Sequence, residues 1–151
     1  MLESRDSAWK YRHIQQQVKT AYFAVQKAWT AMDLSISQDY MTASLRTSFH
    51  TKLSWMQYKR QKNVLKRVKL LSAIPVALYD DPDDSKDFVW FHICGRMIDY
   101  TVDVDTGEKT DGSSFPQSFE EYWQFTRAAN GRWVLNEILQ TDQADQIPFS
   151  C

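Results

Sequence analysis

The strongest constraint on the fold is a hairpin pattern near the end of the chain, FEEYWQFTRAANGRWVLNEILQ, at residues 119–140. Large apolar and polar residues alternate in both halves of this segment, and Asn130-Gly131 stands between the halves. Alternation is typical of a half-buried strand, and Asn-Gly between two alternating runs is typical of a hairpin turn. An isolated hairpin is not stable in water, so the rest of the chain must supply a layer that covers its apolar face.

The residues leave the register of this hairpin open. A two-residue turn pairs Arg127 with Val134 and sets Phe125 and Trp123 beside Val134 and Ile138. A one-residue bulge sets the aromatic residues of the first strand beside Trp133 and Leu135 instead. Both registers close a sheet around a covering layer.

A long amphipathic helix is predicted at the start of the chain. Apolar residues recur at spacings of three and four from residue 4 or 6 to residue 32. At 1.5 Å per residue this helix would be roughly 40 Å long, more than a small core can cover. We therefore expect residues 1–13 to project. Within them, Trp-Lys-Tyr-Arg at residues 9–12 resembles a membrane-interface segment, but a frayed or crystal-packed helix end is the favoured interpretation.

Two further helices are predicted before the first strand. Asp33 is expected to end the first helix and to cap a short second one over residues 35–40. Thr42 has the residue type of an N-cap and begins a third helix over residues 43–61, with Asn63 marking its end.

Two more strand patterns lie between the helices and the hairpin. Residues 64–79 are rich in Val, Leu and Ile, and Pro75 within them requires a bulge or an edge position. Residues 88–102 are apolar on both faces, and Gly95 indicates a bulge or a sharp bend. Residues 103–118 are polar and are expected to form a long hairpin tip.

The order of elements predicts an α+β domain. Three helices followed by a meander of four strands favour helices packed on one face of an antiparallel sheet. This domain is expected to span residues 1–141. Residues 142–151 show no period and are predicted to form a loose tail, unless Ile147 and Phe149 dock on the domain.

Charge is distributed unevenly, although the net charge is only −1. Residues 40–79 contain no Asp or Glu, whereas the rest of the chain beyond them is strongly acidic. The candidate anion-binding residues of the acid-free segment are Arg46, Lys52, Lys59, Arg60, Lys62, Lys66, Arg67 and Lys69. Such a surface suits lipid phosphates or an RNA backbone. Trp55 and Tyr58 fit a membrane interface as well as base stacking, and a merely solvated basic helix face is the alternative.

No strong catalytic motif is found in the sequence. It lacks a glycine-rich phosphate loop, a Gly-x-Ser-x-Gly elbow and a His-Glu-x-x-His pair. Asp99-Tyr100 and Glu121-Tyr122 place a carboxylate beside a phenol, and a carboxylate held in an apolar cavity can act as a general base. Carboxylates in solvent or in ion pairs are the favoured interpretation. The prediction is therefore no catalytic residue, no cofactor and no metal site.

Four segments resemble the Tim44-like domain family within the NTF2-like superfamily. The opening helices are similar in AYFAVQKAWTAMDLSISQDYMTASLRTSFHTKL, and the strands in NVLKRVKLLSA, in RMIDYTVDVDTGEKTDGS and in the hairpin. The likeness covers residues 21–140. It implies a cone-shaped α+β domain, in which a curved four-stranded antiparallel sheet wraps three helices around an apolar pocket. Phe91, Ile93, Trp123 and Phe125 are the candidate lining residues, able to hold an acyl chain.

The resemblance also implies a function and a place in the cell. The mitochondrial relatives are peripheral inner-membrane proteins that bind cardiolipin and tether a chaperone motor to a protein translocation channel. The prediction is thus a non-enzymatic adaptor on an anionic phospholipid surface, with a partner in a transport machinery. It would lie in a reducing compartment, on the cytoplasmic face of a bacterial inner membrane or the matrix face of a mitochondrial one. An NTF2-like isomerase or dehydratase and a ribosome- or RNA-binding module are the alternatives.

Overall fold

A computed structural model describes residues 11–80, 82 and 86–147. Helix α2 (Tyr11–Ala31) leads into two 3-10 segments, η2 (Leu34–Ile36) and η3 (Gln38–Tyr40), and then into helix α3 (Ala43–Tyr58). The remaining elements are β1 (Gln61–Tyr79), β2 (Phe88–Asp103), β3 (Lys109–Arg127), β4 (Trp133–Gln140) and a closing 3-10 helix, η5 (Thr141–Gln146).

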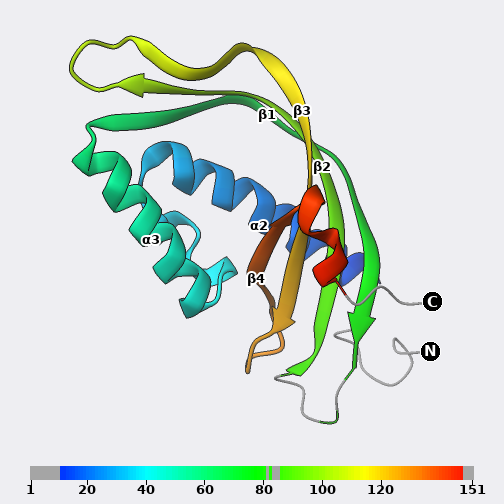
Figure 1. Cartoon of the computed structure of the whole chain (residues 1–151). Helices are drawn as coiled ribbons and strands as arrows, with labels where there is room; N and C mark the ends of the chain where they lie inside the picture. Colours follow the sequence, from blue (N-terminus) through cyan, green and yellow to red (C-terminus); the bar gives the residue numbers. More distant parts are fainter. Residues whose placement is uncertain (1–10, 81, 83–85, 148–151) are drawn as a thin grey trace.

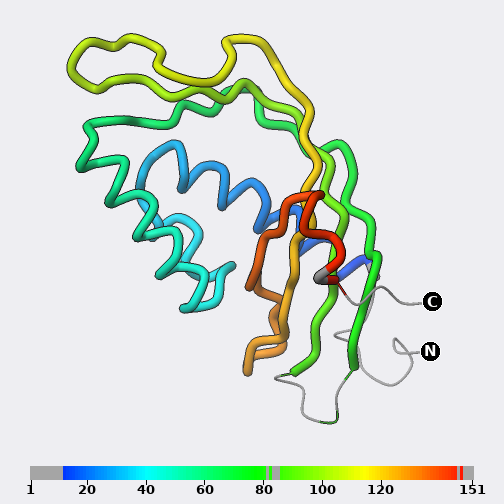
Figure 2. The backbone as a smooth tube through the Cα atoms, in the orientation of Figure 1, coloured from blue at the N-terminus to red at the C-terminus, as the bar shows by residue number. Residues whose placement is uncertain are grey.

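The four strands form one antiparallel sheet in the order β1-β2-β3-β4, so each strand pairs with its neighbour in sequence. The strands bend strongly, and the sheet arches over α2 and α3, which lie on its concave side (Figures 1 and 2). This arrangement confirms the predicted α+β architecture with helices on one face of a curved sheet. The order also confirms one prediction for Pro75, because β1 is an edge strand and its register shifts between Pro75 and Ala77.

The main core lies between α2 and the concave face of the sheet. Val18 and Tyr22 of α2 and Trp123 and Trp133 of the hairpin are almost entirely buried there. The Tyr22 hydroxyl donates a hydrogen bond to the Lys69 carbonyl oxygen at 3.0 Å. These contacts give the aromatic hairpin the covering layer that its composition requires.

Gly95 allows this close approach between α2 and the sheet. A Cβ atom at residue 95 would overlap the Tyr22 hydroxyl and the Phe119 ring. Gly95 pairs with Leu70 and Phe119, and the register between β1 and β2 shifts between Leu70 and Ser72, directly opposite Gly95 and Cys94. The expected bulge is therefore present at this position, although its extra residue, Leu71, belongs to β1, and the glycine also makes room for a helix side chain.

The buried phenol of Tyr22 predicts a loss of stability in alkali. Burial raises the pKa of Tyr22 above its ordinary value of 10.0, and the negative charge of Glu121 raises it further. Above about pH 10 the unfolded chain loses a proton that the folded chain keeps. The free energy of unfolding then falls by up to about 1.4 kcal/mol per pH unit for this proton. Urea denaturation between pH 9 and 11 should show a shallower fall in the Tyr22→Phe variant, and equal slopes would contradict this assignment.

A second, smaller core lies on the outer face of the sheet. Ala77, Trp90, Leu139 and Ile147 are buried together there, next to η5. The stated exception to a loose tail applies to Ile147, because η5 brings this side chain onto the apolar outer face of the sheet. Phe149 lies outside the described residues.

The hairpin register combines features of both predicted forms. Arg127 pairs with Trp133, not with Val134, because residues 128–132 form a longer loop than the expected two-residue turn. Phe125 lies opposite Leu135, as in the bulged form. A register shift between Gln124 and Phe125 then sets Trp123 opposite Ile138, as in the unbulged form.

The predicted number of three helices is wrong, since the described residues form two α-helices. The segment expected as a short second helix consists of η2 and η3, and the Asp33 side chain caps η2 by accepting a hydrogen bond from Ser35 N at 3.0 Å. Thr42 is the N-cap of α3, as predicted. Helix α3 ends at Tyr58 because Arg60 adopts a left-handed conformation with φ of 55°.

Two predicted element boundaries differ from those in the structure, because strand pairing extends β1 and β3. Strand β1 begins at Gln61, which pairs with Asp103, and Asn63 lies inside this strand instead of ending a helix. Only residues 104–108 separate β2 from β3, so most of the polar segment expected as a hairpin tip is strand paired with β2. The expected projecting helix start falls largely on residues 1–10, which lie outside the described residues.

Candidate functional surfaces

Helix α3 presents an exposed aromatic pair between two lysines. Its inner face buries Leu45, Phe49 and Leu53, which recur every four residues. On its outer face, 58% of Trp55 and 81% of Tyr58 are exposed, and the two rings meet edge to face at 5.9 Å.

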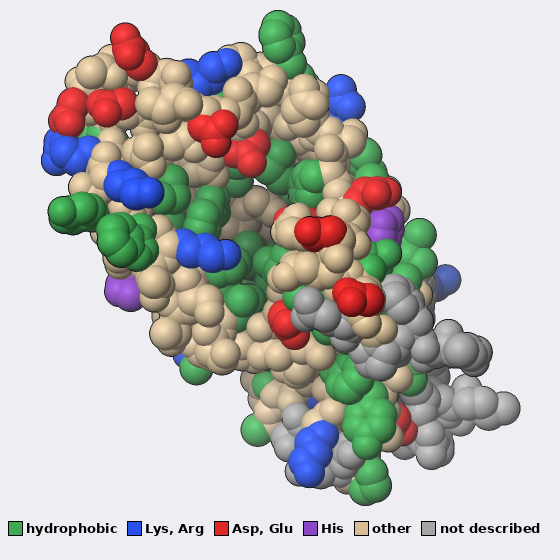
Figure 3. Space-filling view, viewed as in Figure 1, with side chains coloured by type: hydrophobic (Ala, Val, Ile, Leu, Met, Phe, Trp, Pro, Cys, Tyr) green, Lys and Arg blue, Asp and Glu red, His purple; other side chains and the backbone are tan. Residues whose placement is uncertain are grey.

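Lys52 and Lys59 lie three residues before and four residues after Trp55, which is the spacing of neighbours on one helix surface. The Lys52 ammonium itself lies 5.9 Å from the centre of the Phe49 ring, and its side chain lines the adjoining cavity. We call Lys52, Trp55, Tyr58 and Lys59 the α3 foot. Hydrophobic and basic side chains adjoin one another over this end of α3, at the left of Figure 3. A shallow depression of about 520 Å³ lies on the same surface, lined by His50, Thr51, Ser54 and the two aromatic residues.

Arg60 and Arg46 make structural contacts. Both oxygens of Asp105 accept hydrogen bonds from Arg60, at 2.7 and 2.6 Å. These bonds lower the pKa of the Asp105 carboxyl group. The pair ties the end of α3 to the β2–β3 turn and offsets the charge of Arg60. Arg46 donates to the carbonyl oxygen of Gln38 at 2.9 Å and so holds η3 against α3.

The basic residues of β1 do not share one surface with the α3 foot. The Lys66 ammonium lies 5.7 Å from the centre of the Tyr100 ring, on the outer face of the sheet. Lys69 lines a groove with Arg12 and Lys19 of α2. The eight basic residues that stand together in the sequence are therefore distributed over several surfaces. Lys62 and Arg67 are exposed on β1.

The four candidate pocket residues lie mainly in the packed core. Phe91, Ile93 and Phe125 are at most 1% exposed and belong to the main core. Trp123 is also buried, and it lines a cavity of about 240 Å³ between α2, α3 and the sheet.

This cavity has a mixed lining of aromatic and charged side chains. Trp29 and Phe49 form part of its wall, and Asp99 and Glu121 contribute carboxylates. Asn63 Nδ2 donates to Asp99 at 2.8 Å, and Trp123 Nε1 donates to Glu121 at 3.0 Å.

The phenols proposed as acids lie away from this cavity. Because neighbouring residues of a strand point to opposite faces, Tyr100 and Tyr122 face outward where Asp99 and Glu121 face inward. Consistent with this, Tyr100 packs under Lys66 and Tyr122 packs against the outer core. The carboxylate–phenol pairs needed by the isomerase alternative are therefore not brought into one pocket.

Sequence reasoning missed one buried ion pair and one groove. Asp87, which precedes β2, pairs with Arg127 at the end of β3 at a distance of 3.1 Å, and Asp87 is fully buried. Asp87 stands at the end of an acidic segment with the composition of a turn, and its partner is distant in the sequence, so no local pattern indicated the pair.

Among residues 11–80, 82 and 86–147, no group of three His, Cys, Asp or Glu side chains is placed to hold a metal ion. In the same part of the chain, neither helix has both the length and the hydropathy of a membrane span.

Comparisons with known proteins identify the family. The model of the Tim44-like domain family matches residues 1–140. The crystal structure of the intermembrane space region of the chloroplast protein ARC6 is similar in fold, with a TM-score of 0.51 and 10% sequence identity. The match covers 82% of this chain and 96% of that chain. The search of curated proteins found no match. Because the family match spans nearly the whole sequence, the chain belongs to the Tim44-like domain family and has its NTF2-like fold.

Proposed function

We propose that this domain is a non-enzymatic, membrane-peripheral adaptor associated with protein transport, and that it binds anionic lipid through the α3 foot. The observation that carries this proposal is the exposed pair of Trp55 and Tyr58, flanked on the helix by Lys52 and Lys59. Amphipathic aromatic rings favour the headgroup region of a bilayer. Each lysine near an anionic surface adds about 1 kcal/mol of attraction.

Membership in the Tim44-like family supports the association with transport. Both membranes predicted from the sequence, the bacterial inner membrane and the mitochondrial inner membrane, fit a surface of this composition. We expect fewer basic residues to contact lipid headgroups than the sequence predicts. Arg46 and Arg60 have structural partners, and Lys66 and Lys69 lie on other surfaces. Lys62, close behind the foot in the sequence, is the additional residue that we expect to reach headgroups.

Removing the two lysines of the foot should weaken binding to anionic vesicles strongly. The Lys52→Gln/Lys59→Gln double variant loses about 2 kcal/mol of attraction, which corresponds to a roughly 30-fold lower partition coefficient. Sedimentation with phosphatidylglycerol vesicles at low salt measures this coefficient directly.

Lys66 and Arg96 provide a control with the same change in net charge. Both are exposed on the sheet, where Lys66 lies over the Tyr100 ring and Arg96 contacts Ser118. The Lys66→Gln/Arg96→Gln variant should therefore bind vesicles within about threefold of the unmodified domain, a difference of about 0.7 kcal/mol. Equal losses in the two double variants would refute the assignment to the α3 foot and leave only a general charge effect.

A further inference from the structure

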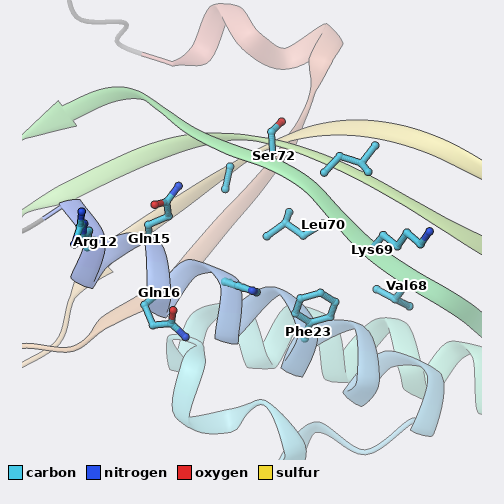
Figure 4. A pocket seen from close by; sticks show the side chains of 11 residues that line it. Arg12, Gln15, Gln16, Phe23, Val68, Lys69, Leu70 and Ser72 are labelled. Atoms are coloured by element: carbon cyan, nitrogen blue, oxygen red, sulfur yellow. The ribbon is translucent and has the colours of Figure 1, made fainter.

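Helix α2 has a second face, beside the one that packs against the core, on which polar side chains and one apolar side chain are exposed. Arg12, Gln16, Lys19 and Phe23 are spaced by four, three and four residues, which places them on one face. All four are exposed, and Phe23 is an apolar ring with 38% of its surface in solvent. These four residues form a stripe that runs beside β1, as Figure 4 shows. It is a helical face that the main core does not use.

Strand β1 offers an unpaired sheet edge next to this stripe. Among residues 11–80, 82 and 86–147, β1 pairs only with β2, so half of its backbone N–H and C=O groups point away from the sheet. Side chains of α2 bind part of this backbone: Thr30 contacts Asn63 O and Leu65 N, and Tyr22 contacts Lys69 O.

Beyond Lys69, the edge lacks the charges that usually protect an edge strand. Residues 70–79 contain no charged side chain. Leu71 and Ile74 are 52% and 53% exposed. Natural edge strands are commonly blunted by lysines, bulges or proline. Here the lysines precede the segment, one register shift lies within it between Leu70 and Ser72, and Pro75 limits pairing on its far side.

The space between the stripe and the edge is a cationic groove. Its volume is about 760 Å³, within the usual range of ligand sites. The floor contains Phe23, Val68 and Leu70, and the charged residues that line it are Arg12, Lys19 and Lys69. None of the described lining residues is acidic. The groove follows β1 from Val68 to Ala73, a length of roughly 17 Å at the rise of a strand, which suits an extended segment of five or six residues.

We propose that this groove binds an extended acidic segment of a protein partner, which adds a strand alongside β1. Main-chain hydrogen bonds to the edge supply affinity, as in other cases of strand addition. Carboxylates on the side of the segment that faces α2 pair with Arg12 and Lys19, and apolar side chains on the other side lie beside the exposed Leu71 and Ile74. The proposal goes beyond lipid binding and does not depend on it, because it uses neither the aromatic pair nor the lysines of the α3 foot.

A peptide titration without vesicles tests this proposal. The probe is a fluorescein-labelled heptapeptide that alternates Glu and Val, measured by fluorescence anisotropy at low salt with the whole domain. We expect saturable binding of this peptide and none of a matched peptide that alternates Lys and Val. The Lys19→Glu variant should bind at least tenfold more weakly, and Lys109→Glu, with the same change in net charge, should bind as the unmodified domain does.

Amide hydrogen exchange separates strand addition from simple charge attraction. Bound peptide should slow exchange in residues 68–74, because added main-chain hydrogen bonds protect the edge. Binding without protection there, or equal weakening by Lys19→Glu and Lys109→Glu, would overturn the proposal. Vesicle sedimentation that Lys19→Glu abolishes, with peptide binding unchanged, would overturn it too and assign the groove to anionic lipid.

Discussion

Replacing Arg127 with Met should lower the free energy of unfolding by about 3–5 kcal/mol, because it removes the guanidinium that pairs with a buried carboxylate. The Asp87 side chain is 0% exposed and that of Arg127 is 9% exposed, with 3.1 Å between Nη1 and Oδ2. The Arg127 amide also donates to the Asp87 carbonyl oxygen at 3.4 Å. The pair joins the start of β2 to the end of β3, so its loss affects both strands.

Two matched variants make this result interpretable. Arg96→Met removes an exposed guanidinium that contacts Ser118, and it should change stability by no more than about 0.5 kcal/mol. The Asp87→Leu/Arg127→Met double variant removes both charges and should be more stable than Arg127→Met alone, since it leaves no buried carboxylate behind. Urea denaturation measures all three. An Arg127→Met variant as stable as Arg96→Met would show that the buried pair contributes little.

Trp123→Ala should destabilise the domain by a similar amount, about 3–5 kcal/mol, because it removes a large buried side chain and leaves a cavity. Trp123 is 1% exposed. Its ring lies 5.5 Å from that of Tyr22, and its indole N–H donates to Glu121. The side chain therefore links α2 to the centre of the sheet.

Trp55→Ala is the matched control for that substitution. Trp55 is 58% exposed, so its replacement should leave the unfolding midpoint almost unchanged while it weakens binding to anionic vesicles. The two tryptophan variants thus separate stability from lipid binding. A Trp55→Ala loss of stability as large as that of Trp123→Ala would mean that Trp55 supports the fold instead of a membrane contact.

The parts of the fold that were predicted correctly are marked by short sequence patterns within the elements themselves. Alternation around Asn130-Gly131 identified the hairpin, Thr42 has the side chain of an N-cap, and Pro75 cannot donate to a central ladder. Each of these signals depends on a few neighbouring residues. Register did not follow from them, because the loop after Arg127 and the shift at Gln124 depend on packing against α2.

The parts that failed depend on contacts between distant residues. Arg60 ends α3 and pairs with Asp105, 45 residues later, so no pattern near residue 60 indicated either role. Residues 109–118 are polar and yet form strand, because pairing with β2 fixes them. A count of charges likewise could not show that the basic residues divide between the α3 foot, the outer face and the groove. Strand alternation and the bulges of β1 decide that division.

Lipid binding through the α3 foot is tested most directly by sedimentation of the unmodified domain with vesicles of defined charge over a range of salt concentrations. We expect binding to phosphatidylglycerol or cardiolipin vesicles, little binding to phosphatidylcholine vesicles, and a fall in binding as salt screens the two lysines of the α3 foot. Equal binding to neutral and anionic vesicles, or no binding to either, would contradict it.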